Sequence, residues 1–245
     1  MKLRAMKSDV ENAMLAGAMK TLLLMRKKTD VLDLPEKLRQ VVDVETGIEG
    51  GDIEAIRALF KKSPEAASEH LMRLKRLTAE AKAPATIAHV KEILSAGRKV
   101  IVFSDHRESL HAIYNEFRSE GAVIIDGSVQ DRDTPVQNFQ NDARCRVFCG
   151  NIKAAGVGLT LTAASDVVFN DVTWLPSDML QAEDRSHRIG TTGTVNIYYV
   201  ADQNMLIDTV MMKILSMRSQ EIASFEQSEQ TFMREVQRWA QANND

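Results

Sequence analysis

Long apolar segments are missing from the sequence. The 245-residue chain contains no apolar run that approaches the ~18 residues needed to span a bilayer as a helix. The first residues, Met1 to Arg4, are not followed by the apolar core of a secretory signal. We therefore expect an intracellular protein with no membrane partner. A hydrophobic content of 44% and a charged content of 27% are ordinary for a globular protein, and the length suits one large or two small domains.

Cysteine is scarce, and histidine is scattered. The two cysteines, Cys145 and Cys149, bracket an apparent strand, and their even spacing predicts that both lie on one face of it. No second pair of Cys or His residues has the spacing of zinc ligands, and none of the five histidines forms a cluster with another. We expect two buried free thiols and no metal site built from this chain's own side chains.

An excess of positive charge is also missing. The net charge is −3, whereas a protein that binds nucleic acid without sequence preference usually shows a basic surface. Any contact with nucleic acid must therefore be local. Basic residues gather at 26–28, 61–62 and 73–76, where a solvated helix face is the commoner explanation and a phosphate site the rarer one.

Strands and helices alternate from residue 84 to residue 220. Apolar runs of strand length, separated by helices, predict a parallel sheet with helices on both faces, which is a doubly wound α/β domain. The expected strands cover 99–104, 122–126, 145–149, 166–170 and 195–200. The expected helices cover 85–96, 107–119, 133–140, 177–188 and 204–220, and a short helix follows residue 149.

The two ends of the chain have a different texture. Residues 1–83 are predicted to form a mainly helical segment, which ends where Pro84 begins the α/β domain. Residues 221–245 are predicted to form an amphipathic helix that docks on its own domain or on a partner. Within the first segment the helices are expected at 1–30, 53–61 and 64–82, with a short strand at 38–46.

Residues 181–190 are the most informative segment. If they are helical, Gln181, Asp184, Arg185 and Arg188 share one narrow stripe, because successive residues turn by about 100°. Two guanidinium groups held side by side repel each other unless an anion lies close to both, and a polyphosphate is a natural candidate. The alternative is a solvated helix face with i,i+3 and i,i+4 ion pairs.

The same ten residues resemble motif VI of the Swi/Snf-type DNA translocases, a family within helicase superfamily two. In that family the motif reads roughly Q-A-x-D-R-x-H-R-I-G. Residues 153–164 resemble motif V, typically R-A-G-G-L-G-I-N-L-T-A-A, with departures at Lys153, Ala155 and Thr160. Further elements are similar to motif IV (104–107), the D-G-S element (126–128), D-x-x-W-x-P (170–176) and the R-R-x-K…L-P-x-K linker (25–37). The wording is closest to the annealing-helicase branch.

The resemblance implies a RecA-like fold and a motor that hydrolyses ATP between two RecA-like lobes. In the family the first lobe carries a G-K-T/S phosphate loop and a D-E-x-H motif, and ATP and Mg²⁺ are bound mainly by that lobe. This chain contains neither motif. It is therefore expected to be the second lobe, either as a fragment or as half of a split enzyme, and to be inactive alone. Duplex DNA and a first lobe are its expected partners.

The resemblance also implies roles for single residues. Arg188 and Arg185 would reach the γ-phosphate, and Gln181 and Asp184 would orient the two arginines or link them to the first lobe. Gly156 and Gly158 would line the nucleotide with Asp184 and both arginines. Ser104, Lys153, Thr160 and Thr162 would hold the DNA backbone.

Several alternatives remain open. Ser104 or Asp105 could simply cap a helix, and Trp174 beside Pro176 could simply be packed. The whole chain could be a non-catalytic module that binds nucleic acid or a partner, or it could be a lobe of an RNA helicase.

Overall fold

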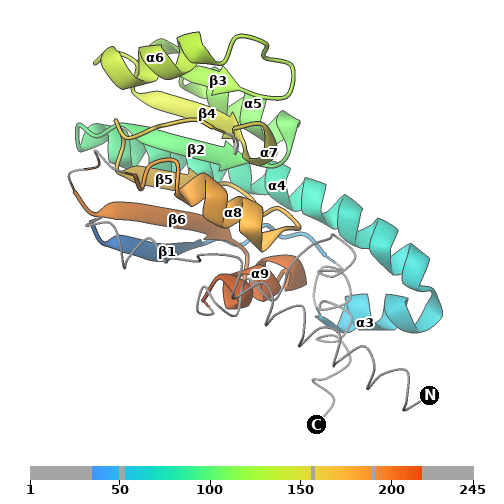
Figure 1. Cartoon of the computed structure of the whole chain (residues 1–245). Coiled ribbons are helices and arrows are strands. Elements are labelled where there is room, and N and C mark those ends of the chain that lie inside the picture. Colours follow the sequence, from blue (N-terminus) through green and yellow to red (C-terminus); the bar gives the residue numbers. More distant parts are fainter. Residues whose placement is uncertain (1–34, 50–52, 156–157, 189–190, 192, 217–245) are drawn as a thin grey trace, which may run out of the picture. The chain divides into compact units, whose positions relative to one another are not determined.

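The computed structural model describes residues 35–49, 53–155, 158–188, 191 and 193–216. Its centre is a six-stranded parallel sheet with the order β1-β6-β5-β2-β4-β3 (Figure 1). Strand β2 is buried along its whole length, as expected for an apolar run in the middle of a parallel sheet. The strands are β1 (Lys37–Asp43), β2 (Val100–Ser104), β3 (Val123–Ile125), β4 (Val147–Asn151), β5 (Asp166–Phe169) and β6 (Val195–Ala201).

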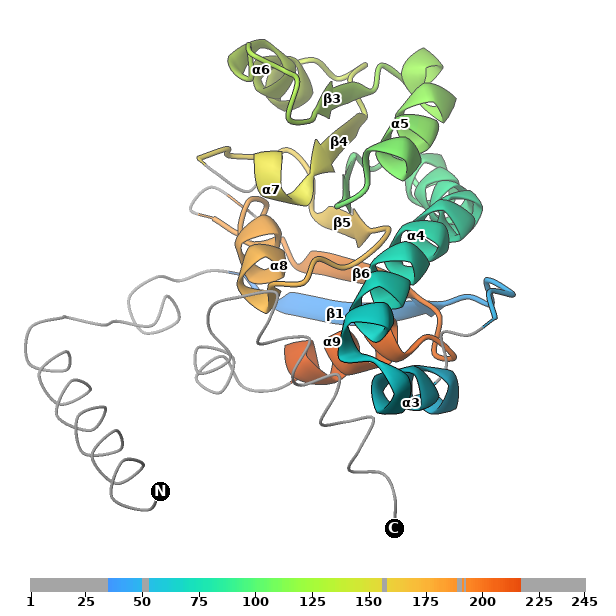
Figure 2. The same cartoon turned by 90° about the vertical axis from the view of Figure 1, so that its right-hand side faces the viewer.

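Helices cover both faces of this sheet. In Figure 2, α4 and α5 lie on one side, and α6, α7 and α8 lie on the other. Each side has its own apolar cluster, so the predicted α/β fold is confirmed. The helices are α3 (Ile53–Lys62), α4 (Pro64–Ser95), α5 (Arg107–Glu116), α6 (Asp133–Asn141), α7 (Ile152–Ala155), α8 (Pro176–Glu183) and α9 (Leu206–Ser216), with the 3₁₀ turn η1 (Arg118–Glu120).

Strand β1 extends the sheet by one strand beyond the five predicted for the α/β domain. It pairs in parallel with β6 over its whole length, from Lys37 opposite Val195 to Asp43 opposite Ala201. It is an edge strand and largely exposed, so its sequence lacks the unbroken apolar run that marks the inner strands. The short strand expected at 38–46 is thus present, but it belongs to the sheet.

Helix α4 is one continuous helix, and the prediction of two helices separated at Pro84 is wrong. Pro84 lies inside the helix, although a proline removes one backbone hydrogen bond there. Ala79, Ala83 and Val90 around it are buried, and this packing holds the helix together. The boundary expected between residues 83 and 84 therefore falls within an element, and the described residues from Pro35 onward form one compact unit.

The two cysteines are free and buried, as predicted, but they do not share a face. Cys145 packs in the cluster that contains Phe148, and Cys149 packs in the cluster on the opposite face with Val147. Cys145 precedes β4, so the alternation of a strand does not reach it. Burial raises the pKa of both thiols.

The helices expected at 1–30 and 221–245 lie outside the described residues. No helix in the described part of the chain is both long and apolar enough to cross a bilayer.

Candidate nucleotide and DNA site

The turn that carries the two arginines begins where α8 ends. Helix α8 stops at Glu183, so the predicted helix over 177–188 is too long, and the predicted single stripe is wrong for the arginines. Gln181 is exposed in the last helical turn. Asp184 is the C-cap, and its N–H donates to the carbonyl of Leu180 across 3.1 Å. Arg185 and Arg188 follow in a turn, because side chains there compete for the backbone groups that a longer helix would use.

Hydroxyl groups define the shape of this turn. The Ser186 hydroxyl donates to the Glu183 carbonyl across 3.1 Å. The Thr191 hydroxyl donates to the Ser186 carbonyl across 2.6 Å, and it lies 3.3 Å from the backbone N of Arg188. These bonds shape the turn formed by the described residues 184–188 and 191, hereafter the arginine turn.

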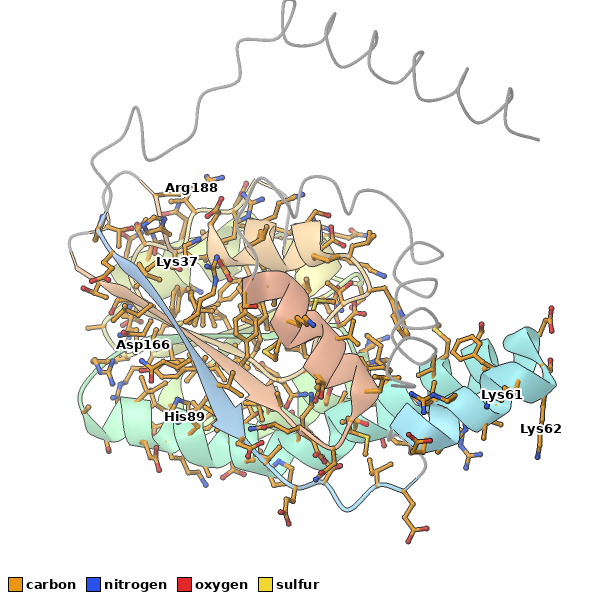
Figure 3. The ribbon with its side chains drawn as sticks, turned by 90° about the horizontal axis from the view of Figure 1, so that it is seen from below. Lys37, Lys61, Lys62, His89, Asp166 and Arg188 are labelled. Carbon is orange, nitrogen blue, oxygen red and sulfur yellow. The ribbon has the colours of Figure 1, made fainter. Side chains whose placement is uncertain are left out.

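The two arginines have different surroundings. Arg185 is only 7% exposed, and its Nη1 lies 3.4 Å from the Leu159 carbonyl. Burial lowers the pKa of Arg185, and the neighbouring charge of Arg188 lowers it further. Arg188 is half-buried, and its Nη1 donates to the Thr160 hydroxyl across 3.2 Å. Arg188 lies at the rim of the molecule near the start of β1 (Figure 3).

The loop from β4 to β5 runs across the sheet from strand ends to strand starts. Lys153 lies just after the end of β4, where its exposed Nζ is 4.0 Å from Asp105 Oδ1. Further along, the Leu161 N–H donates to the Arg185 carbonyl across 3.0 Å. The segment that resembles motif V therefore connects the carboxyl edge of the sheet to the arginine turn. That turn itself lies beside the starts of β1 and β6.

Gln140 fixes the far end of this loop, and nothing in its sequence context indicated that role. Its amide donates to the Thr162 hydroxyl across 3.1 Å, and its carbonyl oxygen accepts from the Ala163 N–H across 2.8 Å. Thr162 is half-buried as a result, whereas Thr160 is exposed. Gly158 has a φ of 77°, which favours glycine. The predicted nucleotide residue Gly156 lies outside the described residues.

Ser104 has a fully buried side chain. Its hydroxyl donates to the His106 carbonyl across 3.1 Å and lies 2.9 Å from the Ser109 hydroxyl. Helix α5 has His106 as its N-cap, without a side-chain bond to the helix. Neither Ser104 nor Asp105 is therefore the N-cap that the alternative expected, and the buried Ser104 hydroxyl instead shapes the loop after β2.

Comparison with known proteins shows the family of the chain. Residues 85–190 match the family described as Helicase conserved C-terminal domain. In an alignment of 227 positions that covers 87% of this chain, it is 36% identical to the SWI/SNF-related matrix-associated actin-dependent regulator of chromatin subfamily A-like protein 1 homolog of Caenorhabditis elegans. In an alignment of 217 positions that covers 81% of this chain, it is 36% identical to the DNA annealing helicase and endonuclease ZRANB3 of Bos taurus. The chain is a C-terminal lobe of the Swi/Snf helicase family.

The fold is shared more widely than the sequence. The Sulfolobus solfataricus SWI2/SNF2 ATPase core in complex with dsDNA superimposes with a TM-score of 0.61 at 20% identity, over 91% of this chain and 53% of that one. The chain spans 33% of the worm relative and 20% of the bovine one. The chain thus corresponds to one part of each of these longer relatives.

A buried lysine also lies at the carboxyl edge of this Swi/Snf lobe. Lys75 of α4 was expected on a solvated helix face, but its side chain is only 3% exposed. Its Nζ lies 2.7 Å from Asp105 Oδ2, 3.2 Å from His106 Nε2 and 5.6 Å from the centre of the Trp174 ring. Trp174 is buried, in agreement with the packing alternative. Burial and the charge of Lys75 lower the pKa of His106.

In the part of the chain that the structure describes, no group of three or more His, Cys, Asp or Glu residues could hold a metal ion. The groups that suit a nucleotide here are cationic, and a guanidinium binds phosphate oxygens rather than Mg²⁺.

Proposed function

We propose that this lobe is the second half of an ATP-dependent translocase that moves on duplex DNA inside the cell. Arg188 would contact the γ-phosphate of ATP that a separate first RecA-like lobe binds with Mg²⁺. The single observation that carries the proposal is the half-exposed guanidinium of Arg188, with the buried Arg185 beside it. Two neighbouring cations destabilise each other, and a bound phosphate relieves that repulsion.

The chemistry of such a group is electrostatic. A guanidinium stays protonated at all ordinary pH values, so it stabilises charge on the transferring phosphoryl group and transfers no proton. Arginine fingers accelerate phosphoryl transfer by about 10³–10⁵-fold, which corresponds to roughly 4–7 kcal/mol of activation free energy. Arg185 would lie buried beside Arg188 and add to the positive charge near the phosphate. Gln181 and Asp184 would orient the two arginines.

The proposed DNA contacts lie along the segment that resembles motif V. Lys153 is exposed at the carboxyl edge and would contact a backbone phosphate, and Thr160 and Thr162 follow on the same segment. Ser104 would act indirectly, by shaping the loop that bears Asp105, since its own hydroxyl is buried. The related archaeal ATPase core was solved with duplex DNA, which supports this choice of nucleic acid.

The test is reconstitution with a first lobe. The isolated chain should hydrolyse no ATP, because it lacks the sequence G-x-x-x-x-G-K-[ST]. When it is mixed with a Swi/Snf first lobe, duplex DNA should stimulate hydrolysis, and Arg188→Ala should lower kcat by about 10³-fold or more. Arg118→Ala is the matched control, since Arg118 is exposed on η1.

The same assay separates the alternatives. If duplex DNA still stimulates ATP hydrolysis fully with the Arg188→Ala variant, the proposed role of Arg188 as an arginine finger is contradicted. A non-catalytic module predicts that Arg188→Ala weakens DNA binding without a change in turnover. An RNA helicase lobe predicts that duplex RNA stimulates the reconstituted enzyme better than duplex DNA.

A further inference from the structure

A buried carboxylate joins the arginine turn to the first strand of the sheet. Glu183, the last residue of α8, has no exposed side-chain surface. It accepts hydrogen bonds from Arg39 Nε at 2.8 Å and Nη2 at 2.7 Å, from Lys37 Nζ at 3.0 Å and from the Tyr199 hydroxyl. Burial favours a raised pKa, but the bonds from Arg39 and the charges of both cations outweigh it, so the pKa of Glu183 is lowered.

Two further contacts join the same two segments. Lys37 Nζ also lies 2.9 Å from Asp184 Oδ1, so one ammonium group bridges two consecutive carboxylates. His187 Nε2 lies 2.7 Å from the carbonyl oxygen of Pro35. On one side the side-chain contacts come from Lys37 and Arg39, which are alternate residues on one face of β1, and Pro35 contributes its backbone carbonyl. On the other side they come from residues that flank Arg185 and precede Arg188.

These contacts restrain the arginine turn strongly. An ionised carboxylate without exposed surface depends on its cationic partners, because unpaired it would be a buried charge. The start of β1 and the end of α8 must therefore keep their relative positions while Glu183 stays ionised. Arg188 lies five residues after Glu183, and Figure 3 shows both Arg188 and Lys37 near the start of β1.

We propose that Lys37, Arg39 and Glu183 form a clamp that positions the arginine turn, so that the chain entering β1 sets where the guanidinium of Arg188 lies. The three residues are positioning residues and contact no substrate. This inference rests on the proposed function, since Arg188 is the group that the clamp places. Residues 25–37 resemble the linker between the two lobes of the family, so the clamp would tie the interlobe connection directly to the arginine turn.

The first experiment does not depend on ATP hydrolysis. Hydrogen–deuterium exchange of the amides of residues 184–191 is measured on the whole chain and on Glu183→Gln and Lys37→Met. Both variants should exchange faster in this segment, and Lys37→Arg should restore protection because it keeps a cation near both carboxylates. Lys91→Met is the matched control, since it removes an exposed ion pair with Glu116 between α4 and α5. Unchanged exchange in both clamp variants would overturn the proposal.

The second experiment uses the reconstituted enzyme. Lys37→Met should lower kcat by roughly tenfold to a hundredfold, as expected when a reacting group is misplaced by about an ångström, and leave KM for ATP and the affinity for DNA unchanged. Lys37→Arg should recover most of kcat. A purely structural ion pair would instead lower the melting temperature and the amount of folded protein with no change in kcat per folded molecule.

The two proposals fail in different ways. If Arg188→Ala abolishes turnover but Lys37→Met and Arg39→Met keep full kcat, the clamp is overturned and the finger stands. If Arg188→Ala is fully active, the proposed function fails, and faster exchange in the clamp variants would still show that the turn is held from β1. If the Glu183→Gln variant fails to fold, the Lys37→Met variant carries the test, because the Lys37 side chain is partly exposed.

Discussion

The N–H of Leu161 donates to the carbonyl of Arg185 across 3.0 Å, so the loop that follows β4 and the turn that follows α8 are bonded through their backbones. The same two segments meet again through side chains, where Arg188 Nη1 donates to the Thr160 hydroxyl. A displacement of residues 159–161 would therefore reach both arginines through these bonds. This physical connection is what a motor needs if DNA binding is to alter ATP hydrolysis.

Lys153 tests the DNA side of the proposal. Lys153→Ala should weaken binding of the reconstituted enzyme to duplex DNA about equally for all sequences. It should also reduce the slope of log K against log salt by about one, because each phosphate contact releases about one counterion. Fluorescence anisotropy at several salt concentrations measures both effects. The exposed Lys213 of α9 provides the control variant Lys213→Ala, and an unchanged slope for Lys153→Ala would exclude the phosphate contact.

The buried ion pair between Lys82 and Asp208 should matter for stability. Lys82 Nζ lies 2.8 Å from Asp208 Oδ2, both side chains are almost fully buried, and Asp208 also accepts from the Asp202 N–H. Lys82→Met leaves a buried carboxylate without its cation and should lower the free energy of unfolding by about 3–5 kcal/mol. Urea denaturation measures this loss. The exposed pair of Lys91 and Glu116 should cost less than about 1 kcal/mol when Lys91→Met breaks it.

His106 should make the lobe less stable below neutral pH. Its pKa in the folded protein lies below the ordinary value of 6.5, because of burial and the charge of Lys75, while Asp171, Asp105 and Glu108 act in the opposite direction. The unfolded chain therefore binds a proton at His106 more readily than the folded chain does. The contribution of the neutral His106 to the free energy of unfolding is present above pH 6.5 and is lost as the pH falls.

The measurement compares urea denaturation at pH 7.5 and pH 5.5. His106→Asn should show a smaller fall in the free energy of unfolding between these two values than the unchanged protein. The buried carboxyls with lowered pKa, such as Glu183 and Asp126, titrate below this range. An equal fall in both proteins would show that His106 is not the group responsible.

Alanine substitutions at two glycines distinguish the cost of backbone strain from the cost of a steric clash. Gly121 and Gly97 have φ values of 70° and 78°, so alanine is strained at either position. A Cβ at Gly121 would lie 2.4 Å from the carbonyl oxygen of Arg144, whereas one at Gly97 would meet nothing within 4 Å. Gly97→Ala should cost about 1 kcal/mol, and Gly121→Ala should cost clearly more. Equal melting temperatures for the two variants would contradict this reading.

Local patterns predicted the inner sheet well. Apolar runs at the places of β2, β4, β5 and β6 identified buried parallel strands, because each strand shows its burial in its own residues. The edge strand β1 was predicted only as an isolated short strand, since its exposed residues reveal no partner. The composition change at Pro84 suggested a boundary that the packing of α4 overrides.

Long-range contacts explain what the sequence did not reveal about the site. One segment of the sequence was enough to single out Asp184, Arg185 and Arg188. Which of the two arginines is buried and which is half-exposed depends on where α8 ends. Gln140 was missed, and Lys75 was wrongly expected on a solvated helix face, because their partners are distant in sequence: Thr162 for Gln140, and Asp105 for Lys75. Neither lies in a motif, and neither has a neighbour pattern that differs from an ordinary polar helix face.

The continuity of β1 with the rest of the lobe has a practical consequence for protein production. A shortened gene product limited to residues 85–190, the span that matches the family, would lack β1, β6 and the first two thirds of α4. Glu183 would then keep its charge without Lys37, Arg39 or Tyr199 to neutralise or solvate it. Boundaries for recombinant work on this lobe should therefore begin before Pro35 and end after Ser216.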